Sequence, residues 1–447
     1  MNAIDVFTDW LEGYLNFERT PKKNIFWLDT IDYLCKRFDN PQDNAPCVHI
    51  AGSKGKGSVS KMIACILEAA GYKVGLYSSP HITDFRERIS MPGGYFDENI
   101  YEEAIKEMVP KIESIIPENL PAERPITWFE LVTLYSFLVF RKAKTDWNVF
   151  EVGMGGRLDS TNVIRPKLCC LTPIELEHTE FLGNTPEEIA AEKAGIIKNS
   201  TPVVIAKQNY ESAKIVFREK AITRHAPYYF VEDLTKNLKY NFDSKKHKMN
   251  IHFESEIFNR PIETSLSLLG KMQLENAAMA AIAVRKIFPN LSEDIIEKGL
   301  ANAKLPGRFE ILEKVPGFDG ISKVILDGAH TLNSIKLSLD TLNKMFDNAK
   351  ANLLFACAAD KDIKDISIVL KHRFEKVFIT RPGAVKHSDL EAEKEAFKNA
   401  QIPFEADSDY KNMIIKALKE SQKDGNILLV TGSFYLVAEF LHLVYHL

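Results

Sequence analysis

The chain is short of the features that mark secreted, membrane-spanning and disulfide-bonded proteins. Only six of its 447 residues are cysteines, and they form neither a C-x-x-C pair nor a Cys/His spacing typical of a metal site. No apolar run reaches the roughly 18 residues that a membrane-spanning helix needs. The N-terminus lacks the basic region and the small-residue cleavage site of a signal peptide. These absences predict a cytoplasmic protein with free thiols and no contact with a membrane.

The sequence also lacks an excess of charge of either sign. Lysine and arginine number 57 against 61 aspartates and glutamates, which gives a formal net charge of -4. Without a basic field, nucleic acid is excluded as the main partner. The one basic cluster, at residues 244–248, is interpreted as a solvated turn. The hydrophobic fraction of 45% is that of an ordinary globular protein, and the length predicts two or three domains.

Strand-like and helix-like segments alternate through the first half of the chain. Short apolar runs predict strands at residues 47–52, 72–80, 147–153, 167–174 and 201–207. Helical spacing predicts helices at residues 58–71, 130–143 and 185–198. Thr185, Pro186 and Glu188 supply an N-cap, a first-turn proline and a capping box for the last of these helices. Such alternation predicts a doubly wound α/β domain with a mostly parallel sheet.

The pattern changes near residue 231 and changes back near residue 305. Residues 248–255 alternate apolar and polar side chains, which predicts exposed antiparallel strands at the edge of the first domain. After a candidate linker at Pro306 and Gly307, strands are predicted at residues 323–330, 352–360, 376–380 and 426–433. We therefore expect an N-terminal P-loop ATPase-like domain at residues 1–303, with a small antiparallel sheet. A smaller Rossmann-like α/β domain is expected at residues 304–447.

The segment HIAGSKGKGSVS, residues 49–60, is a candidate phosphate-binding loop with an unusual spelling. The common form, G-x-x-x-x-G-K-[ST], places the hydroxyl residue directly after the lysine. Here Gly57 separates Lys56 from Ser58. The glycines let backbone N–H groups turn toward an anion at the start of a helix, and Lys56 would add a positive charge. The strand–loop–helix context favours this interpretation over a glycine-rich turn with a solvated lysine.

Polar side chains follow several of the predicted strands. Ser79 comes after one strand, and Glu151 stands near the end of another, where burying a carboxylate is costly unless something pairs with it. A magnesium ion that bridges phosphates would provide such pairing. His178 lies beside several carboxylates, although a lone histidine is more often structural. Lys193 lies on the apolar part of its helix, where a surface lysine with a buried stem is the simpler interpretation.

The second domain adds three candidates. Arg308 lies at the predicted domain junction, and Asp327 and His330 follow an apolar strand. An arginine there can bind phosphate through two hydrogen bonds, and an aspartate can accept hydrogen bonds from a ribose. A structural salt bridge or a helix cap remains an equal alternative for each of them.

These segments, in this order, resemble the folylpolyglutamate synthase/dihydrofolate synthase family of the Mur-ligase superfamily. That family's loop is G-T-N-G-K-G-S, with the same extra glycine, so this chain departs from it only at Ser53 and Lys54. The resemblance covers nearly the whole chain. Its motifs are NPQDNAPCVHIAG, SSPHITDFRERIS, ITWFE, EVGMGGRLDSTN, LEHTEFLG, IAAEKAGIIK, QLENAA, PGRFE, LDGAH and TGSFYLVAEF.

The resemblance implies a role for each matching residue. Lys56, Lys193 and His330 are expected to take part in catalysis, Lys193 as a carbamate that supplies an anionic oxygen ligand. The other implied contacts are to ATP, to magnesium and to the pterin-bearing substrate. The contacts to ATP are Gly55, Lys56, Gly57, Ser58, Asn276, Arg308 and Asp327. The contacts to magnesium are Ser79, Glu151, His178 and carbamylated Lys193. The contacts to the pterin-bearing substrate are Arg88, Thr127, Phe129, Asp159 and Ser160. Two magnesium ions are expected, and ATP is expected to draw the two domains together.

The implied reaction is ATP-dependent addition of L-glutamate to dihydropteroate and to folates through an acyl phosphate, with release of ADP and phosphate. A bifunctional enzyme of the bacterial type is favoured by the presence of both ITWFE and RLDSTN. A monofunctional folylpolyglutamate synthase, a more distant cell-wall amino-acid ligase, a nucleotide-dependent switch and a scaffold with a decayed site are the alternatives. Met272, Thr331 and Ser160 depart from common family residues. We expect a monomer with small-molecule substrates.

Overall fold

The computed structural model describes residues 3–16, 27–347, 349–383 and 387–445. Their contacts divide the chain into two compact units. The first comprises residues 1–239, 251–264 and 272–303, and the second comprises residues 240–250, 265–271 and 304–447. No helix in the described ranges is long and apolar enough to cross a bilayer. All six cysteines fall within these ranges, and each is buried with a free thiol.

The first unit contains a seven-stranded sheet with the order β3-β2-β4-β1-β5-β6-β7. All neighbours are parallel except β3, which pairs with β2 in the antiparallel direction. The strands are β1 (Cys47–Ala51), β2 (Val74–Tyr77), β3 (Ile89–Ser90), β4 (Trp147–Glu151), β5 (Leu168–Leu171), β6 (Val203–Ile205) and β7 (Tyr228–Phe230). The predicted doubly wound α/β fold with a mostly parallel sheet is confirmed.

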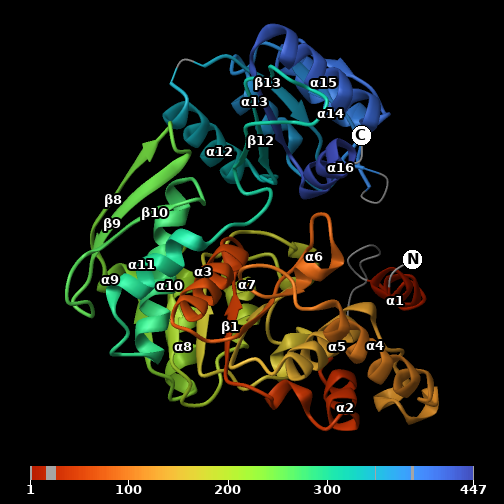
Figure 1. Cartoon of the computed structure of the whole chain (residues 1–447), viewed down its shortest axis with the longest axis vertical. Coiled ribbons are helices and arrows are strands. Elements are labelled where there is room, and N and C mark those ends of the chain that lie inside the picture. The colour runs from red at the N-terminus through yellow and green to blue at the C-terminus, as the bar shows by residue number, and fades with distance from the viewer. Residues whose placement is uncertain (1–2, 17–26, 348, 384–386, 446–447) are drawn as a thin grey trace. The chain divides into compact units, whose positions relative to one another are not determined.

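The helices around this sheet include the three that the sequence predicts, together with others (Figure 1). They are α1 (Ala3–Leu11), α2 (Asp29–Arg37), α3 (Lys56–Ala69), α4 (Glu98–Glu113), α5 (Trp128–Ala143), α6 (Thr179–Leu182), α7 (Pro186–Ala194), α8 (Glu211–Thr223), α9 (Val231–Leu234), α10 (Lys271–Ile287) and α11 (Glu293–Asn302). The predicted capping box of α7 is confirmed, because the Thr185 hydroxyl accepts from Glu188 N–H and the Glu188 carboxylate accepts from Thr185 N–H.

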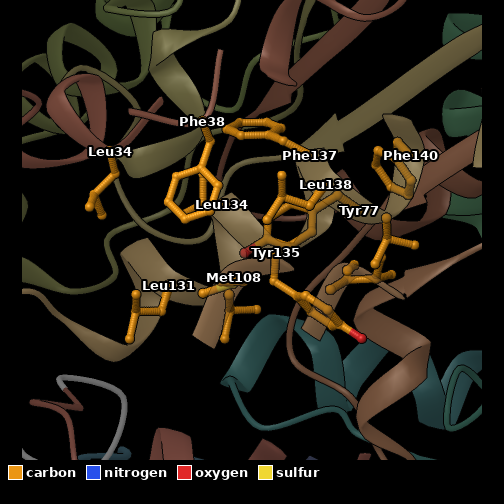
Figure 2. Packing of buried hydrophobic residues seen from close by; sticks show 14 of the residues in the cluster. Leu34, Phe38, Tyr77, Met108, Leu131, Leu134, Tyr135, Phe137, Leu138 and Phe140 are labelled. Carbon is orange, nitrogen blue, oxygen red and sulfur yellow. The ribbon is translucent and has the colours of Figure 1, made fainter. Parts of the chain in front are cut away.

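Helix α5 lies in a large apolar cluster of the first unit. Nearly all of its side chains are buried, as expected for a helix that is hydrophobic on every face. Figure 2 shows its Tyr135, Phe137 and Phe140 packed with Tyr77 of β2 and Phe38 beyond α2. This packing fixes the start of α5, where Thr127 and Phe129 lie.

Helix α3 follows β1 and packs against it, against β4 and against α11 (Figure 1). Gly299 makes the contact with α11 possible, since a Cβ at this position would overlap the backbone of Ile66. Helix α3, which follows the glycine-rich loop, is therefore held from several sides.

Strands β8 (Lys236–Asp243), β9 (Lys248–Glu254) and β10 (Ile262–Leu266) form a separate antiparallel sheet with the order β10-β9-β8. The alternating burial of β9 confirms the predicted period of two. The predicted small antiparallel sheet is confirmed. The large sheet ends at the three-residue strand β7, whose short apolar run gives a weak signal.

The second unit contains a six-stranded sheet with the order β11-β12-β16-β13-β14-β15, parallel except at β11. The strands are β11 (Glu310–Leu312), β12 (Lys323–Asp327), β13 (Ala351–Phe355), β14 (Val377–Ile379), β15 (Glu405–Ala406) and β16 (Ile427–Thr431). The helices are α12 (Leu332–Met345), α13 (Ile363–Leu370), α14 (Leu390–Asn399), α15 (Tyr410–Asp424) and α16 (Phe434–Tyr445). The predicted second α/β fold is confirmed.

Candidate active site

The candidate residues of the first unit gather at one edge of its sheet. Strands β2, β4, β1 and β5 are parallel neighbours, so their carboxyl ends point to the same side. The glycine-rich loop follows β1, Ser79 follows β2, Glu151 ends β4, and His178 follows β5. Open α/β sheets bind their ligands at this edge, where connections leave neighbouring strands in different directions.

The loop after β1 is held against the segment that follows β5. The backbone N–H groups of Ser53 and Lys54 donate to the carbonyl of Pro173, at 3.0 and 3.3 Å. Gly52 has a φ of +145°, and a Cβ there would overlap the Thr172 side chain. The Lys56 ammonium donates to the Gly52 carbonyl at 3.0 Å, so the lysine folds back over its own loop.

Two further glycines allow close approach to polar side chains. Gly55 caps the start of α3 with a φ of +91°, and a Cβ there would lie 2.6 Å from Asn276 Oδ1. A Cβ at Gly57 would lie 3.4 Å from Glu151 Oε2. The structure therefore brings Gly55 and Asn276 together, and it places the Glu151 carboxylate beside the first turn of α3. Ser58 lies in the same turn and is buried.

The Glu151 carboxylate is buried, with 5% of the residue exposed. Its Oε2 accepts from the Ser79 backbone N–H at 3.3 Å. Glu151 and Ser79 together provide a carboxylate and a hydroxyl group next to the glycine-rich loop. Oxygen atoms of these kinds are the ligands that magnesium prefers. Among the described residues, no three His, Cys, Asp or Glu side chains form a metal-binding cluster. Glu151 and Ser79 are the residues that would hold a magnesium ion beside the loop.

Lys193 is buried, with only 2% of its side chain exposed, so the surface interpretation of this lysine is wrong. Its ammonium lies 3.6 Å from Glu177 Oε1, and the Lys54 ammonium lies 3.4 Å from Glu177 Oε2. Burial lowers the pKa of Lys193 to about 8. The negative charge of Glu177 opposes this shift, and the positive charge of Lys56 adds to it. Near neutral pH, a share of this amine is therefore unprotonated, and this is the form that reacts with carbon dioxide.

Glu177 is a central residue of the site that the sequence interpretation missed. Burial raises the pKa of its carboxyl, but the charges of Lys193, Lys56 and Lys54 outweigh burial and lower this pKa to about 2. The carboxylate thus balances three lysines around the loop. In the sequence, only its place beside His178 marks this segment. That the segment borders the loop follows from β5 lying beside β1. His178 itself is exposed and opens α6 with a φ of +50°.

The residues expected to contact the pterin form a second group at the same sheet edge. The Thr127 hydroxyl caps α5 by accepting from Glu130 N–H at 3.2 Å. A Cβ at Gly153 would lie 2.5 Å from Phe129 Cζ and 3.2 Å from Asp159 Oδ2. Phe129 and the loop after β4 are therefore in contact through Gly153. Ser160, the residue after Asp159, is buried at the start of a 3-10 turn at Ser160–Val163.

Arg88 also belongs to this second group. It is 2% exposed, and its Nε donates to His81 Nδ1 at 2.7 Å. Its guanidinium lies 4.9 Å from the ring centre of Trp128, which stands between Thr127 and Phe129. A buried guanidinium beside the start of α5 gives this region a fixed positive charge, suited to the carboxylate of an anionic substrate.

Two candidates of the second unit, Arg308 and His330, lie beside Phe434. The Arg308 guanidinium lies 4.2 Å from the centre of the Phe434 ring, and the His330 ring centre lies 6.1 Å from it. His330 Nδ1 lies 2.8 Å from the Gly328 carbonyl and must donate to it, which leaves Nε2 unprotonated in the neutral ring. Burial raises the pKa of Asp327 to about 6, and the charge of Arg308 opposes the shift.

Comparison with known proteins agrees with this arrangement. The model of the Mur ligase middle domain matches residues 50–284, and that of the Mur ligase glutamate ligase domain matches residues 307–434. The chain is 30% identical over 438 residues to the dihydrofolate synthase/folylpolyglutamate synthase of Bacillus subtilis, covering 96% of each chain.

Solved structures are similar over the whole length as well. The folylpolyglutamate synthase of Mycobacterium tuberculosis complexed with ADP gives a TM-score of 0.84 at 26% identity, covering 98% of this chain and 97% of that one. Escherichia coli FolC in complex with DHPP and ADP gives a TM-score of 0.80 at 25% identity, with the same coverage.

Proposed function

The chain belongs to the dihydrofolate synthase/folylpolyglutamate synthase family of the Mur ligases, and we propose that it joins L-glutamate to a pterin-linked carboxylate. The reaction consumes ATP and releases ADP and phosphate. The observation that carries the proposal is the lysine-bearing loop after β1, with the buried Glu151 carboxylate beside its helix. Similar structures hold ADP, which supports nucleotide binding by this chain.

The chemistry follows from the weakness of a carboxylate as an electrophile. Transfer of the γ-phosphoryl group of ATP to the carboxylate creates an acyl phosphate, whose leaving group is phosphate. The α-amine of glutamate then attacks the acyl carbon and expels that phosphate. Lys56 and the N–H groups at the start of α3 would neutralise charge on the transferring group, so catalysis rests on positioning and electrostatics.

We propose that magnesium binds beside the loop through Glu151 and Ser79, with His178 and carbamylated Lys193 serving a second ion. When bound, magnesium supplies positive charge that neutralises the phosphate oxygens during transfer. The buried position of Lys193 and the lowered pKa of its amine support the carbamate. Lys193 would then exchange its cationic group for an anionic oxygen ligand.

The second unit is proposed to serve the nucleotide and the incoming amine. Arg308 and Asp327 would bind ATP, as would Asn276 of the first unit. His330, with Nε2 unprotonated in the neutral ring, would position glutamate and accept the proton of its amine. We propose that the domains span residues 1–303 and 304–447 and that the protein is a cytoplasmic monomer.

We further propose that the enzyme is bifunctional and accepts both dihydropteroate and folates. The contact of Phe129 with the loop that carries Asp159 and Ser160 supports a pterin pocket, and Arg88 supplies a buried cation near it. Relatives with the bifunctional name, and an E. coli structure with DHPP, are consistent with this proposal. A monofunctional folylpolyglutamate synthase is the alternative.

Phosphate release by the purified protein with MgATP tests the proposal. Release should require both L-glutamate and an acceptor, and it should occur with 7,8-dihydropteroate as well as with tetrahydrofolate. An acceptor labelled with ¹⁸O in its carboxylate should pass one labelled oxygen to the released phosphate. Release that depends on tetrahydrofolate alone would show a monofunctional enzyme. Release without dependence on an acceptor would assign the chain to the nucleotide switches.

A further inference from the structure

A chain of hydrogen bonds connects the middle of β1 to the loop that carries Asp159. His49 lies in β1, between β4 and β5, and it is fully buried. Its Nε2 lies 2.8 Å from the Thr161 hydroxyl oxygen. The same hydroxyl lies 2.5 Å from Asp159 Oδ1. Three side chains from two segments, far apart in the sequence, are thus joined inside the first unit.

The number of protons available shows which group donates and which accepts in each of these hydrogen bonds. The Thr161 hydroxyl has one proton, and its short contact with a carboxylate oxygen requires that it donates to Asp159. The hydroxyl must therefore accept from His49, which places the imidazole proton on Nε2. His49 Nδ1 has no hydrogen-bond partner among the described residues. This fits, because an unprotonated ring nitrogen is the less costly group to leave unpaired. Burial lowers the pKa of His49 to about 3, so the ring is neutral and carries one N–H.

The Asp159 carboxylate has its hydrogen-bonding capacity filled by its own loop. Oδ1 accepts from the Thr161 hydroxyl and from Thr161 N–H at 3.0 Å. Oδ2 accepts from Met154 N–H at 3.0 Å, and the Gly153 N–H also donates to the carboxylate. An ionised carboxylate offers about four lone-pair sites. The carboxylate thus shapes the loop after β4, and a pterin would meet a surface that Asp159 organises.

We propose that His49 and Thr161 are positioning residues for the pterin-bearing substrate, because they lock the Asp159 loop onto the strand that leads into the phosphate loop. The inference rests on the proposed ligase function and deepens it. Neither side chain needs to touch substrate. Their effect is to keep the loop after β4 in the one conformation that places Phe129, Gly153 and Ser160 together.

Substitution of Thr161 tests the proposal through substrate-specific kinetics. T161V keeps the shape of the side chain and removes the hydroxyl, whereas T161S keeps the hydroxyl. We expect T161V to raise KM for dihydropteroate about ten-fold or more, as for loss of a hydrogen bond to a charged group, while KM for ATP stays within about two-fold. T161S should restore most of the affinity. T133V, which removes another buried hydroxyl, from the bond with Tyr77, is the matched control. Equal changes in both KM values, or none, would overturn the proposal.

His49 offers a test with its own conservative variant. The amide nitrogen of glutamine lies near the position of Nε2 in histidine, whereas that of asparagine lies near Nδ1. H49Q should therefore keep a donor for Thr161 and retain the low KM for dihydropteroate, and H49N should behave like T161V. Melting temperatures of all variants separate loss of folding from loss of positioning. An H49N protein with wild-type KM for dihydropteroate would contradict the proposal.

The state of His49 can be read without any ligase activity. Ring ¹⁵N chemical shifts of the wild-type protein should show protonated Nε2 and bare Nδ1, unchanged from pH 8 down to about pH 5. A wild-type protein that shows this tautomer and ligates no glutamate would sink the proposed function and leave the hydrogen-bond chain standing. A His49 ring protonated on Nδ1, or one that titrates near pH 6.5, would refute the hydrogen-bond chain even in an active ligase.

Discussion

The ammonium of Lys193 lies 3.6 Å from the carboxylate of Glu177, and this contact contributes to the charge balance around the glycine-rich loop after β1. Lys193 is 2% exposed and Glu177 is 15% exposed. Lys54 shares the same carboxylate, and the charge of Lys56 also lowers the pKa of Glu177. One carboxylate therefore stabilises three lysines in a place where ATP phosphates are proposed to bind.

Removal of this carboxylate should destabilise the protein in the absence of nucleotide. We expect E177Q to lower the free energy of unfolding by about 2 kcal/mol, less than the ~3–5 kcal/mol of a fully buried broken pair, because Glu177 keeps some contact with water. ADP should recover part of the loss, since phosphates replace the missing charge. Urea denaturation with and without ADP measures both effects. E192Q, at the position before Lys193 on α7, breaks the exposed pair with Arg157 and should cost less than about 1 kcal/mol. Equal costs for the two variants would refute the assigned charge balance.

Two glycines with similar backbone angles separate strain from function. Gly55 has a φ of +91° and Gly71 a φ of +95°, but a Cβ at Gly71 would meet nothing within 4 Å. We expect G71A to cost about 1–2 kcal/mol of stability and to leave catalysis unchanged. G55A carries the same strain and also displaces Asn276, so its KM for ATP should rise at least about ten-fold. Thermal unfolding and initial rates measure the two properties. A G55A enzyme with the kinetics of G71A would rule out the predicted role of this contact.

Lys56 should be needed for the chemical step. K56M removes the charge that the loop holds through the Gly52 carbonyl. We expect kcat to fall about 10²–10³-fold, the range for loss of one group that stabilises transition-state charge. Single-turnover rates of phosphoryl transfer measure this, and K106M on the exposed face of α4 is the control. A K56M enzyme with near-normal kcat and only a raised KM would mean that the lysine serves binding alone.

A buried carboxyl in the second unit predicts a pH dependence of stability. Burial raises the pKa of Glu393 to about 8, although the Cys357 N–H and thiol donate to it. Below a pH of about 4.5 the group is protonated in both states. Between about 4.5 and 8 the folded state binds more protons than the unfolded state, so stability falls as pH rises through this window.

The E393Q variant tests this dependence, because glutamine cannot ionise. Its melting temperature should change less between pH 5 and pH 8 than that of the wild-type protein. E391Q, at an exposed position on the same helix, should retain the wild-type slope. If the slopes of E393Q and wild type coincide, Glu393 is ionised throughout this range and the raised pKa is wrong.

Local patterns predicted the parts of the site that single segments determine. The loop at residues 52–58, Glu151 at a strand end and the capping box at Thr185 each depend on neighbours within a few residues. The surroundings of Lys193 cannot be predicted from its neighbours in the sequence. They include a carboxylate that follows β5, and they require β5 to lie beside β1. The sequence contains both segments, but it does not show the order of the strands.

Other features of the fold and the site also depend on contacts that the local sequence does not show. Strands β3 and β15 have two residues each, too few to show a period. The bond between His49 and Thr161 spans 112 positions, and nothing in either segment identifies its partner. The resemblance to a ligase family supplied roles for residues such as Asn276, whose place beside Gly55 only the fold explains.

The mass of the product formed from 7,8-dihydropteroate, MgATP and L-glutamate tests the central claim most directly. A product heavier than the acceptor by one glutamyl residue, formed together with one ADP and one phosphate, is the predicted result. ATP hydrolysis that leaves both dihydropteroate and tetrahydrofolate at their original masses would contradict it.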